Sequence, residues 1–184
     1  VRALLAPTAL AAAPLFDVSA HTGEGIAALR AHLCDAARQH GAAGAQDTAR
    51  AFRLAVDRSF TLAGVGTVVT GTVASGRVQV GDELCITPQR RTVRVRGIHA
   101  QNLRAESAHA GQRCALALAG VAKDEVQRGQ VVCAPAIALC TTRLDVQCQL
   151  WEGEARALRS GTPVHAHLGA CDVVGAIVLG AYVD

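Results

Sequence analysis

Between residues 52 and 133 the sequence consists of short apolar runs, rich in Val, Leu and Ile, that are separated by turns containing glycine. Short runs repeated at intervals of about 8–12 residues are typical of an all-β barrel or sandwich. No segment between them has the apolar spacing of a good helix. This part of the chain therefore predicts a mainly β domain. The residues expected to form strands are 52–56, 67–73, 78–80, 84–86, 93–96, 114–118 and 131–133.

The composition fits a folded domain with an aliphatic core. Of the 184 residues, 51% are hydrophobic but only 3% are aromatic, so the core must be built from Val, Leu, Ile and Ala. The scarcity of aromatic rings argues against a surface that binds ligands mainly by stacking. A chain of this length holds one complete domain, or one domain with pieces of others.

Positive charge is concentrated in the middle of the chain. Residues 50–138 carry twelve basic and six acidic groups, a net charge of +6, whereas residues 1–49 and 139–184 have net charges of −1 and −2. A polyanionic partner is therefore expected to bind the middle segment.

The residues before the β segment predict one strand followed by one helix. Residues 15–18 have the pattern of a short buried strand, and apolar residues from Ile26 onward follow the spacing of a helix that ends at Gly41. A single strand–helix step cannot bury both of its faces, so we interpret residues 1–40 as the end of a larger α/β domain. The small residues within 41–49 predict a linker.

The β domain is expected to span residues 50–138 and to be followed by the beginning of a second one. Residues 143–150, 162–168 and 173–179 have the composition of strands. Three or four strands are too few to close a barrel, so we interpret residues 139–184 as the first part of a second barrel.

The first candidate site follows the predicted strand near the N-terminus. Ser19 and Ala20 lie at a strand-to-helix turn, where backbone N–H groups are presented at the carboxyl end of a sheet. Open α/β folds bind ligands at that edge. The alternative is an ordinary N-terminal cap of the helix.

The second candidate site consists of charges next to predicted core strands. Asp57 and Arg58 lie between apolar Val56 and Phe60, and Arg113 directly precedes an apolar strand. A charge in a buried position needs a partner or a ligand, because an unpaired buried charge is expensive. The alternatives are an internal Asp–Arg ion pair or side chains that face solvent.

Other motifs give weaker evidence of a functional site. The glycine-rich stretch 64–71 lacks the Gly-Lys-Ser/Thr sequence of a phosphate-binding loop and predicts a hairpin. His165, His167 and Cys171 lie close together in the sequence, but no fourth zinc ligand is evident, so packing is favoured over a metal site. The seven cysteines form no C-x-x-C pair and predict reduced thiols. No nucleophile signature indicates an enzyme in its own right.

Nothing in the sequence predicts a membrane segment. No run of about 18 apolar residues is present. Pro7 interrupts the short apolar stretch at the start, which disfavours a secretory signal. Because the chain contains no Met and begins at Val1, we expect it to be part of a longer protein.

Nearly the whole chain resembles one family. The stretches that resemble the second domain of translational GTPases such as elongation factor Tu are 66–72, 75–84, 110–116 and 128–131. Those that resemble the bacterial selenocysteine-specific elongation factors in particular are 57–60, 94–102 and 108–113. The resemblance is strongest over 52–133 and weaker over 139–184. It implies a translation-factor β-barrel, with a GTPase-domain remnant before it and a partial second barrel after it.

The resemblance also implies a role for the first candidate site. In this family the N–H of the residue matching Ala20 contacts the guanine base of GTP, and Ser19 would shape the turn. The phosphate loop and the other GTP-binding elements of the family are not found in this chain. GTP and Mg²⁺ are therefore expected to bind the longer protein, and this chain alone is not expected to hydrolyse GTP.

For the second candidate site, the resemblance implies a pocket for the aminoacyl end of a charged tRNA, formed by Asp57, Arg58 and Arg113. A selenol is markedly more acidic than a thiol, whose pKa is about 8.5, so selenocysteine is an anion near neutral pH whereas serine is neutral. Two guanidinium groups would favour the anion, with Asp57 helping to orient them.

The implied partners are selenocysteinyl-tRNA and the ribosome, and the implied location is the cytoplasm. A selenocysteine insertion element in mRNA would be bound by a region outside this chain. One alternative is another translational GTPase with a different aminoacyl-tRNA, against which Arg58 and Arg113 argue. The other is a structural barrel without RNA contacts. No role follows for His99, and solvent or RNA phosphates are expected around Arg94, Arg96 and Arg104.

Overall fold

The structure is a computed structural model that describes residues 1–40, 49–151 and 153–180. Two compact units are present, and we treat each by itself. The first comprises Val1–Ala43 with Val146–Ala157, and the second comprises Gly44–Asp145 with Leu158–Asp184. In the part of the chain that is described, no helix has both the length and the apolar character needed to cross a bilayer.

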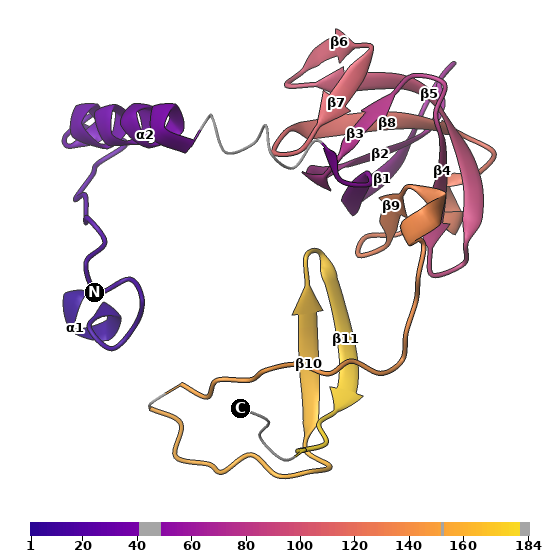
Figure 1. The fold of residues 1–184 in the computed structure, drawn as a ribbon. Helices are drawn as coiled ribbons and strands as arrows, with labels where there is room; N and C mark the ends of the chain where they lie inside the picture. Colours follow the sequence, from indigo (N-terminus) through magenta and orange to yellow (C-terminus); the bar gives the residue numbers. More distant parts are fainter. Residues whose placement is uncertain (41–48, 152, 181–184) are drawn as a thin grey trace. The chain divides into compact units, whose positions relative to one another are not determined.

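The N-terminal residues contain two helices, α1 (Arg2–Leu5) and α2 (Ile26–His40) (Figure 1). The helix expected from Ile26 onward is therefore confirmed. The buried strand expected at 15–18 is wrong, because these residues are irregular and Val18 is 46% exposed. A strand is held by hydrogen bonds to a neighbouring strand, and no described segment pairs with this one.

The second unit is built around a closed antiparallel barrel of six strands (Figure 1). The strands follow the order β4-β9-β1-β2-β8-β5, and the pairing of β5 with β4 closes the ring. Their bounds are β1 Arg53–Leu62, β2 Gly66–Ser75, β4 Glu83–Thr87, β5 Arg91–Ala100, β8 Arg113–Ala119 and β9 Val131–Cys133. The predicted mainly β fold is thus confirmed.

Short elements complete the barrel. Strand β6 (Leu103–Ala105) extends the sheet beyond β5, and β3 (Arg77–Gln79) pairs with β7 (Ser107–His109). Two single-turn 3-10 helices, η2 (Lys123–Glu125) and η3 (Pro135–Ile137), flank β9. The sequence did not predict β6 or β7, because three residues are too few to show an alternating pattern.

The barrel encloses an aliphatic core, as the composition predicts. Along β1, buried Leu54 and Val56 alternate with more exposed neighbours, the pattern of a strand with one face on a core. The only aromatic side chain in the core cluster is Phe52, which is 3% exposed. The fully buried larger side chains are Leu54, Ile86, Ile98, Leu116, Val56, Val69, Val73, Val78, Val93, Val95, Val126 and Val132.

After the barrel, two strands form an antiparallel hairpin, β10 (Pro163–Leu168) and β11 (Cys171–Ala176). They confirm the strand expected at 162–168 and residues 173–176 of the strand expected at 173–179, whose last three residues are irregular. The strand expected at 143–150 is wrong, since these residues are irregular and Val146 is 64% exposed. An apolar run without a paired neighbour does not become a strand.

Candidate functional site

A β-bulge in β1 turns two consecutive charged residues to the outside of the barrel. Leu54 and Val56 are fully buried, so strict alternation along the strand would point Arg58 into the core as well. Instead, the register with β2 shifts between Val56 and Arg58, which makes Asp57 the extra residue. Arg58 is consequently exposed, and its charge stays in water rather than in the core.

Asp57 is joined to Arg113 by an ion pair between Oδ2 and Nη1. Arg113 begins β8 and lies opposite Thr72 of β2, the strand between β8 and β1. The side chains of Arg113 and Asp57 are 57% and 35% exposed, so this pair lies at the surface and leaves other guanidinium donors free for a ligand. Among the described residues, Arg58 has no ion-pair partner.

A hollow of about 280 Å³ lies beside Arg113. Thr70, Ala115 and His99 follow one another in a row across β2, β8 and β5. Directly opposed residues of an antiparallel sheet share a face, so the small Ala115 forms the floor, with Thr70 and His99 as opposite walls. Beyond Thr70 the same row continues to Arg58 on β1.

The turn between β5 and β6 forms the remaining rim of the hollow. Gln101 and Asn102 both line it, with φ angles of 53° and 66° in the left-handed region. The N–H of Gln101 donates to the carbonyl of Arg113 at 3.3 Å, which fixes this turn against the start of β8. The rim therefore offers amide donors and acceptors beside a guanidinium.

One wall of the hollow carries an unsatisfied hydroxyl. The Oγ1 atom of Thr70 is buried and has no hydrogen-bond partner among the described residues. Buried polar atoms are almost always paired, by protein, water or ligand. The hollow thus suits a polar ligand that reaches Thr70.

Sequence reasoning found the charges of this site but not its walls. The structure brings Asp57 and Arg113 into contact and places Arg58 in the row that leads to the hollow. The residues that it missed as site members are Thr70, His99, Gln101, Asn102, Cys114 and Ala115. Only strand register brings them together, and the one sequence signal was the resemblance of 94–102 to a known family.

The first candidate site lies at the turn before α2. The Ser19 hydroxyl accepts a hydrogen bond from the N–H of Thr22 at 3.2 Å, and its carbonyl accepts one from the N–H of Gly23 at 2.8 Å. Ser19 therefore shapes this turn. Within the described ranges the N–H of Ala20 has no acceptor, so it is free to donate to a ligand. Its contact with a guanine base stays a prediction.

The histidines of the hairpin contact a carboxylate. Nδ1 of His165 lies 3.0 Å from Oδ1 of Asp172, and Nδ1 of His167 lies 3.9 Å from the same atom. In the described part of the chain, no three His, Cys, Asp or Glu side chains are arranged to hold a metal ion. The hairpin thus presents an exposed polar cluster.

Cys114, next to Arg113, is a buried thiol. Burial raises the pKa of Cys114 to about 11, which outweighs the lowering effect of the Arg113 charge. The thiol is therefore neutral at ordinary pH, and the charge around the hollow comes from the arginines.

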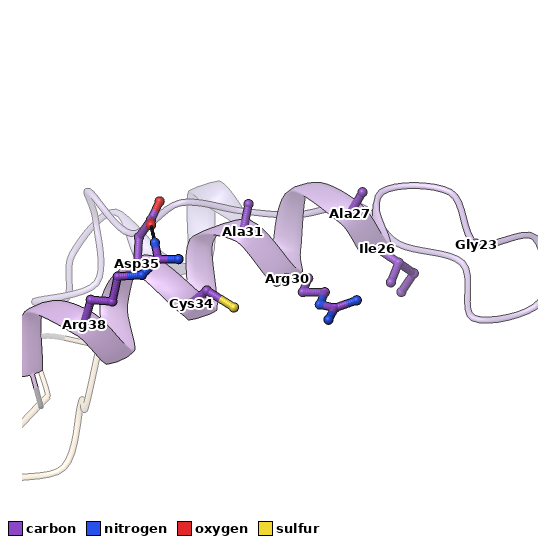
Figure 2. Close-up of a pocket in the computed structure, with 8 residues that line it drawn as sticks. All are labelled: Gly23, Ile26, Ala27, Arg30, Ala31, Cys34, Asp35 and Arg38. Atoms are coloured by element: carbon purple, nitrogen blue, oxygen red, sulfur yellow. Dashed lines mark hydrogen bonds and ion pairs between the residues drawn. The ribbon is translucent and has the colours of Figure 1, made fainter.

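A second hollow, of about 600 Å³, runs along α2. Figure 2 shows that its lining comes from this helix and the turn before it, and that Asp35 and Arg38 pair with each other. Because no second element contributes a facing wall, we do not regard it as a binding site.

The sequence profile of elongation factor Tu domain 2 matches residues 66–133, which covers most of the barrel. Over 97% of its length, the chain is 40% identical to the selenocysteine-specific elongation factor of Escherichia coli. The chain thus belongs to the family of the selenocysteine-specific elongation factors. The corresponding factor of Desulfomicrobium baculatum is 36% identical over 95% of the chain. The segment spans about a quarter of the length of these curated relatives, 28% and 27%.

Solved structures agree with this assignment to the selenocysteine-specific elongation factors. The translation elongation factor SelB of Methanococcus maripaludis, in complex with a GTP analogue, superposes with a TM-score of 0.77 at 25% identity. The match covers 95% of this chain and 39% of that one. The resemblance proposed from the motifs is therefore confirmed, and a factor of the elongation factor Tu type with another specificity is not favoured.

Proposed function

We propose that this segment forms the pocket for the selenocysteinyl group in an elongation factor that uses GTP to deliver selenocysteinyl-tRNA to the ribosome. The observation that carries the proposal is the hollow lined by Thr70, His99 and Arg113, with Arg113 held by Asp57. Arg58, without an ion-pair partner among the described residues, lies in the same row of the sheet.

Charge is the chemical basis of the proposed selection. A selenol loses its proton more readily than a thiol, so selenocysteine carries a negative charge near neutral pH, whereas the hydroxyl of serine is neutral. Guanidinium groups form short charge-assisted hydrogen bonds with anions. Arg113 at the hollow and Arg58 in the same row of the sheet therefore favour the selenolate over a serine hydroxyl on the same tRNA.

The size of the effect follows from the exposure of the arginines. A hydrogen bond to a charged group contributes about 1.5–3 kcal/mol when protected from water. Arg113 is 57% exposed in this chain, so water screening reduces the value toward the surface range of about 1 kcal/mol or less. We therefore expect each arginine to contribute up to about fivefold in affinity, since about 1.4 kcal/mol is a factor of ten.

Asp57 acts as a positioning residue in this proposal. Its carboxylate occupies one side of the Arg113 guanidinium, which leaves the other N–H groups to face a ligand. A fixed guanidinium loses less side-chain entropy on binding than a mobile one.

The other parts of the function lie in the longer protein. Ser19 and Ala20 would form the edge of the GTP site that contacts the base, and Mg²⁺ and the phosphates would be held by segments outside this chain. The ribosome and the mRNA element are likewise proposed partners of the full-length factor, in the cytoplasm.

The test measures the affinity of full-length protein for selenocysteinyl-tRNA and for seryl-tRNA at one fixed salt concentration. Arg113→Asn and Arg58→Ser should each reduce the preference for selenocysteinyl-tRNA by up to about fivefold, and the double variant should abolish most of it. Arg77→Gln is the matched control, because Arg77 on β3 does not line the hollow. Its guanidinium donates to the Ser107 hydroxyl at 3.2 Å instead.

An unchanged preference in the double variant would show that the arginines do not select the ligand. If Arg113→Asn lowered the free energy of unfolding but left the preference unchanged, the ion pair with Asp57 would be structural.

A further inference from the structure

Two cysteines face each other on the side of the barrel wall that is not part of its main core. Cys85 on β4 lies directly opposite Cys133 on β9 in the antiparallel ladder. Their neighbours Ile86 and Val132 are fully buried in the main core cluster, so alternation directs the two cysteines to the opposite face of the sheet. There they form a separate buried cluster with Ala138.

The spacing of this pair suits a covalent bond. Directly opposed residues of an antiparallel pair have Cα atoms about 4.5–5.5 Å apart. A disulfide spans Cα atoms about 4.4–6.8 Å apart, so the Cα spacing expected from this register lies within the disulfide range. Burial raises the pKa of Cys133, neighbouring Cys85 and Cys140 raise it further and Arg53 lowers it, so the net shift keeps the thiol protonated and slows its reaction.

A short segment covers the two thiols. Cys85 and Cys133 are 6% and 2% exposed, and the segment that follows β9 passes through the exposed turn η3 and then contributes Ala138 to their cluster. Cys140, two residues beyond Ala138, is exposed and lies with its Sγ 3.8 Å from the carbonyl of Pro88. The cover is one helical turn long, so reagents reach the thiols through local opening rather than global unfolding.

We propose that Cys85 and Cys133 are an oxidisable dithiol, which a peroxide converts to a disulfide between β4 and β9. One thiolate attacks a peroxide oxygen, becomes a sulfenic acid and releases the alcohol or water of the cleaved O–O bond. The second thiol attacks the sulfenic sulfur and displaces water, so two thiols and one peroxide give one disulfide, one alcohol or water, and one water. The peroxide is reduced by two electrons.

The disulfide would join β4 and β9 directly before the segment that leads out of the barrel. In a reducing compartment such a bond is transient and is reversed by thiol exchange. Because both thiols are buried, their oxidation is slower than that of an exposed cysteine.

The test uses the full chain in a background where the exposed cysteines are replaced by serine, Cys34→Ser, Cys140→Ser and Cys148→Ser. Four thiols remain in this variant: Cys85, Cys114, Cys133 and Cys171. Hydrogen peroxide is added to the folded protein, free thiols are alkylated after unfolding, and the non-reduced digest is analysed by mass spectrometry. We expect the number of free thiols to fall from four to two, with Cys85 and Cys133 in one cross-linked peptide.

Adding Cys85→Ala to the same background is the matched control, and it should abolish the cross-link. We also expect oxidation to raise the melting temperature, because the disulfide joins two strands. A reducing agent should restore all four thiols and reverse this rise. The proposal is overturned if peroxide leaves Cys85 and Cys133 as free thiols, or if Cys133 pairs with Cys114 or Cys171 instead. Since the measurement is made on the unsubstituted pair, it does not depend on whether the Cys85→Ala variant folds.

Discussion

The carboxylate of Asp57 on β1 holds the guanidinium of Arg113 on β8 across the intervening strand β2. These residues are 56 positions apart in the sequence, and the pairing of β1 with β2 and of β2 with β8 brings them together. The pair sets the direction of Arg113 at the margin of the hollow lined by Thr70 and His99. Its value is therefore expected in ligand selection more than in stability.

Replacing Asp57 tests whether the ion pair acts on ligand selection rather than on stability. Asp57→Asn should change the free energy of unfolding by no more than about 1 kcal/mol, because the pair is exposed. The preference for selenocysteinyl- over seryl-tRNA should fall, by less than in Arg113→Asn. If Asp57 acts through Arg113, adding Asp57→Asn to the Arg113→Asn variant should have no further effect. Additive losses in that double-mutant cycle would contradict a positioning role.

Gly71 permits the close approach of β2 to β1 at the bulge. A Cβ atom at this position would lie 2.1 Å from the carbonyl oxygen of Ala55 and 2.9 Å from Cδ2 of Leu54. Gly71→Ala should therefore lower the free energy of unfolding by about 1–3 kcal/mol, as overpacking does. Gly97→Ala is the control, because its Cβ would meet Ala117 at an ordinary 3.9 Å. Equal denaturant midpoints for the two variants would refute this explanation.

The buried thiol of Cys114 gives a prediction for alkaline pH. Its pKa is about 11 in the folded chain, against an ordinary value of 9.0, so between these values the unfolded state holds fewer protons than the folded one. Stability is then fully present below pH 9 and falls as pH rises to 11. The loss is about 3 kcal/mol at most, because raising a pKa by one corresponds to about 1.4 kcal/mol.

The measurement is the free energy of unfolding against pH for the wild type and for Cys114→Ala, whose difference isolates this thiol. Alkylation offers a second readout, in which exposed Cys34 should react at pH 8 while Cys114 does not. Equal alkylation rates for the two cysteines at pH 8 would contradict the raised pKa.

The exposed arginines of the barrel predict salt-dependent RNA binding. Arg94 and Arg96 lie on the exposed side of β5. Arg104 on β6 lies opposite His99 of β5 in the antiparallel ladder. If Arg104 contacts one phosphate, Arg104→Gln should reduce the slope of log affinity against log salt by about 0.7–0.9. The preference for selenocysteine should not change, because phosphate contacts do not read the amino acid. Arg143→Gln, at an exposed position outside the barrel, is the control and should leave the slope unchanged.

The barrel was predictable because its strands are specified locally. Runs such as 67–73 and 114–118 combine branched apolar side chains with glycine turns, and the structure confirms them as parts of β2 and β8. The strands expected at 15–18 and 143–150 have similar composition, yet they lie without a paired neighbour and stay irregular. Composition predicts the capacity to form a strand, whereas pairing decides the outcome.

The candidate site was predictable only in part for the same reason. Asp57, Arg58 and Arg113 were recognised because they are charges beside apolar runs and match a family motif. Thr70 and His99 were not, because their place in one row depends on the register of β2, β8 and β5. Nor does the sequence reveal the bulge, because the bulged strand itself has no glycine or proline there to mark it.

The bulge has a consequence for how specificity can evolve. Because it places residue 58 outside the packed interior, the side chain there can be exchanged without opening a void or burying a charge. A lineage could thus acquire a new amino acid preference at this position while the architecture that surrounds it persists unchanged.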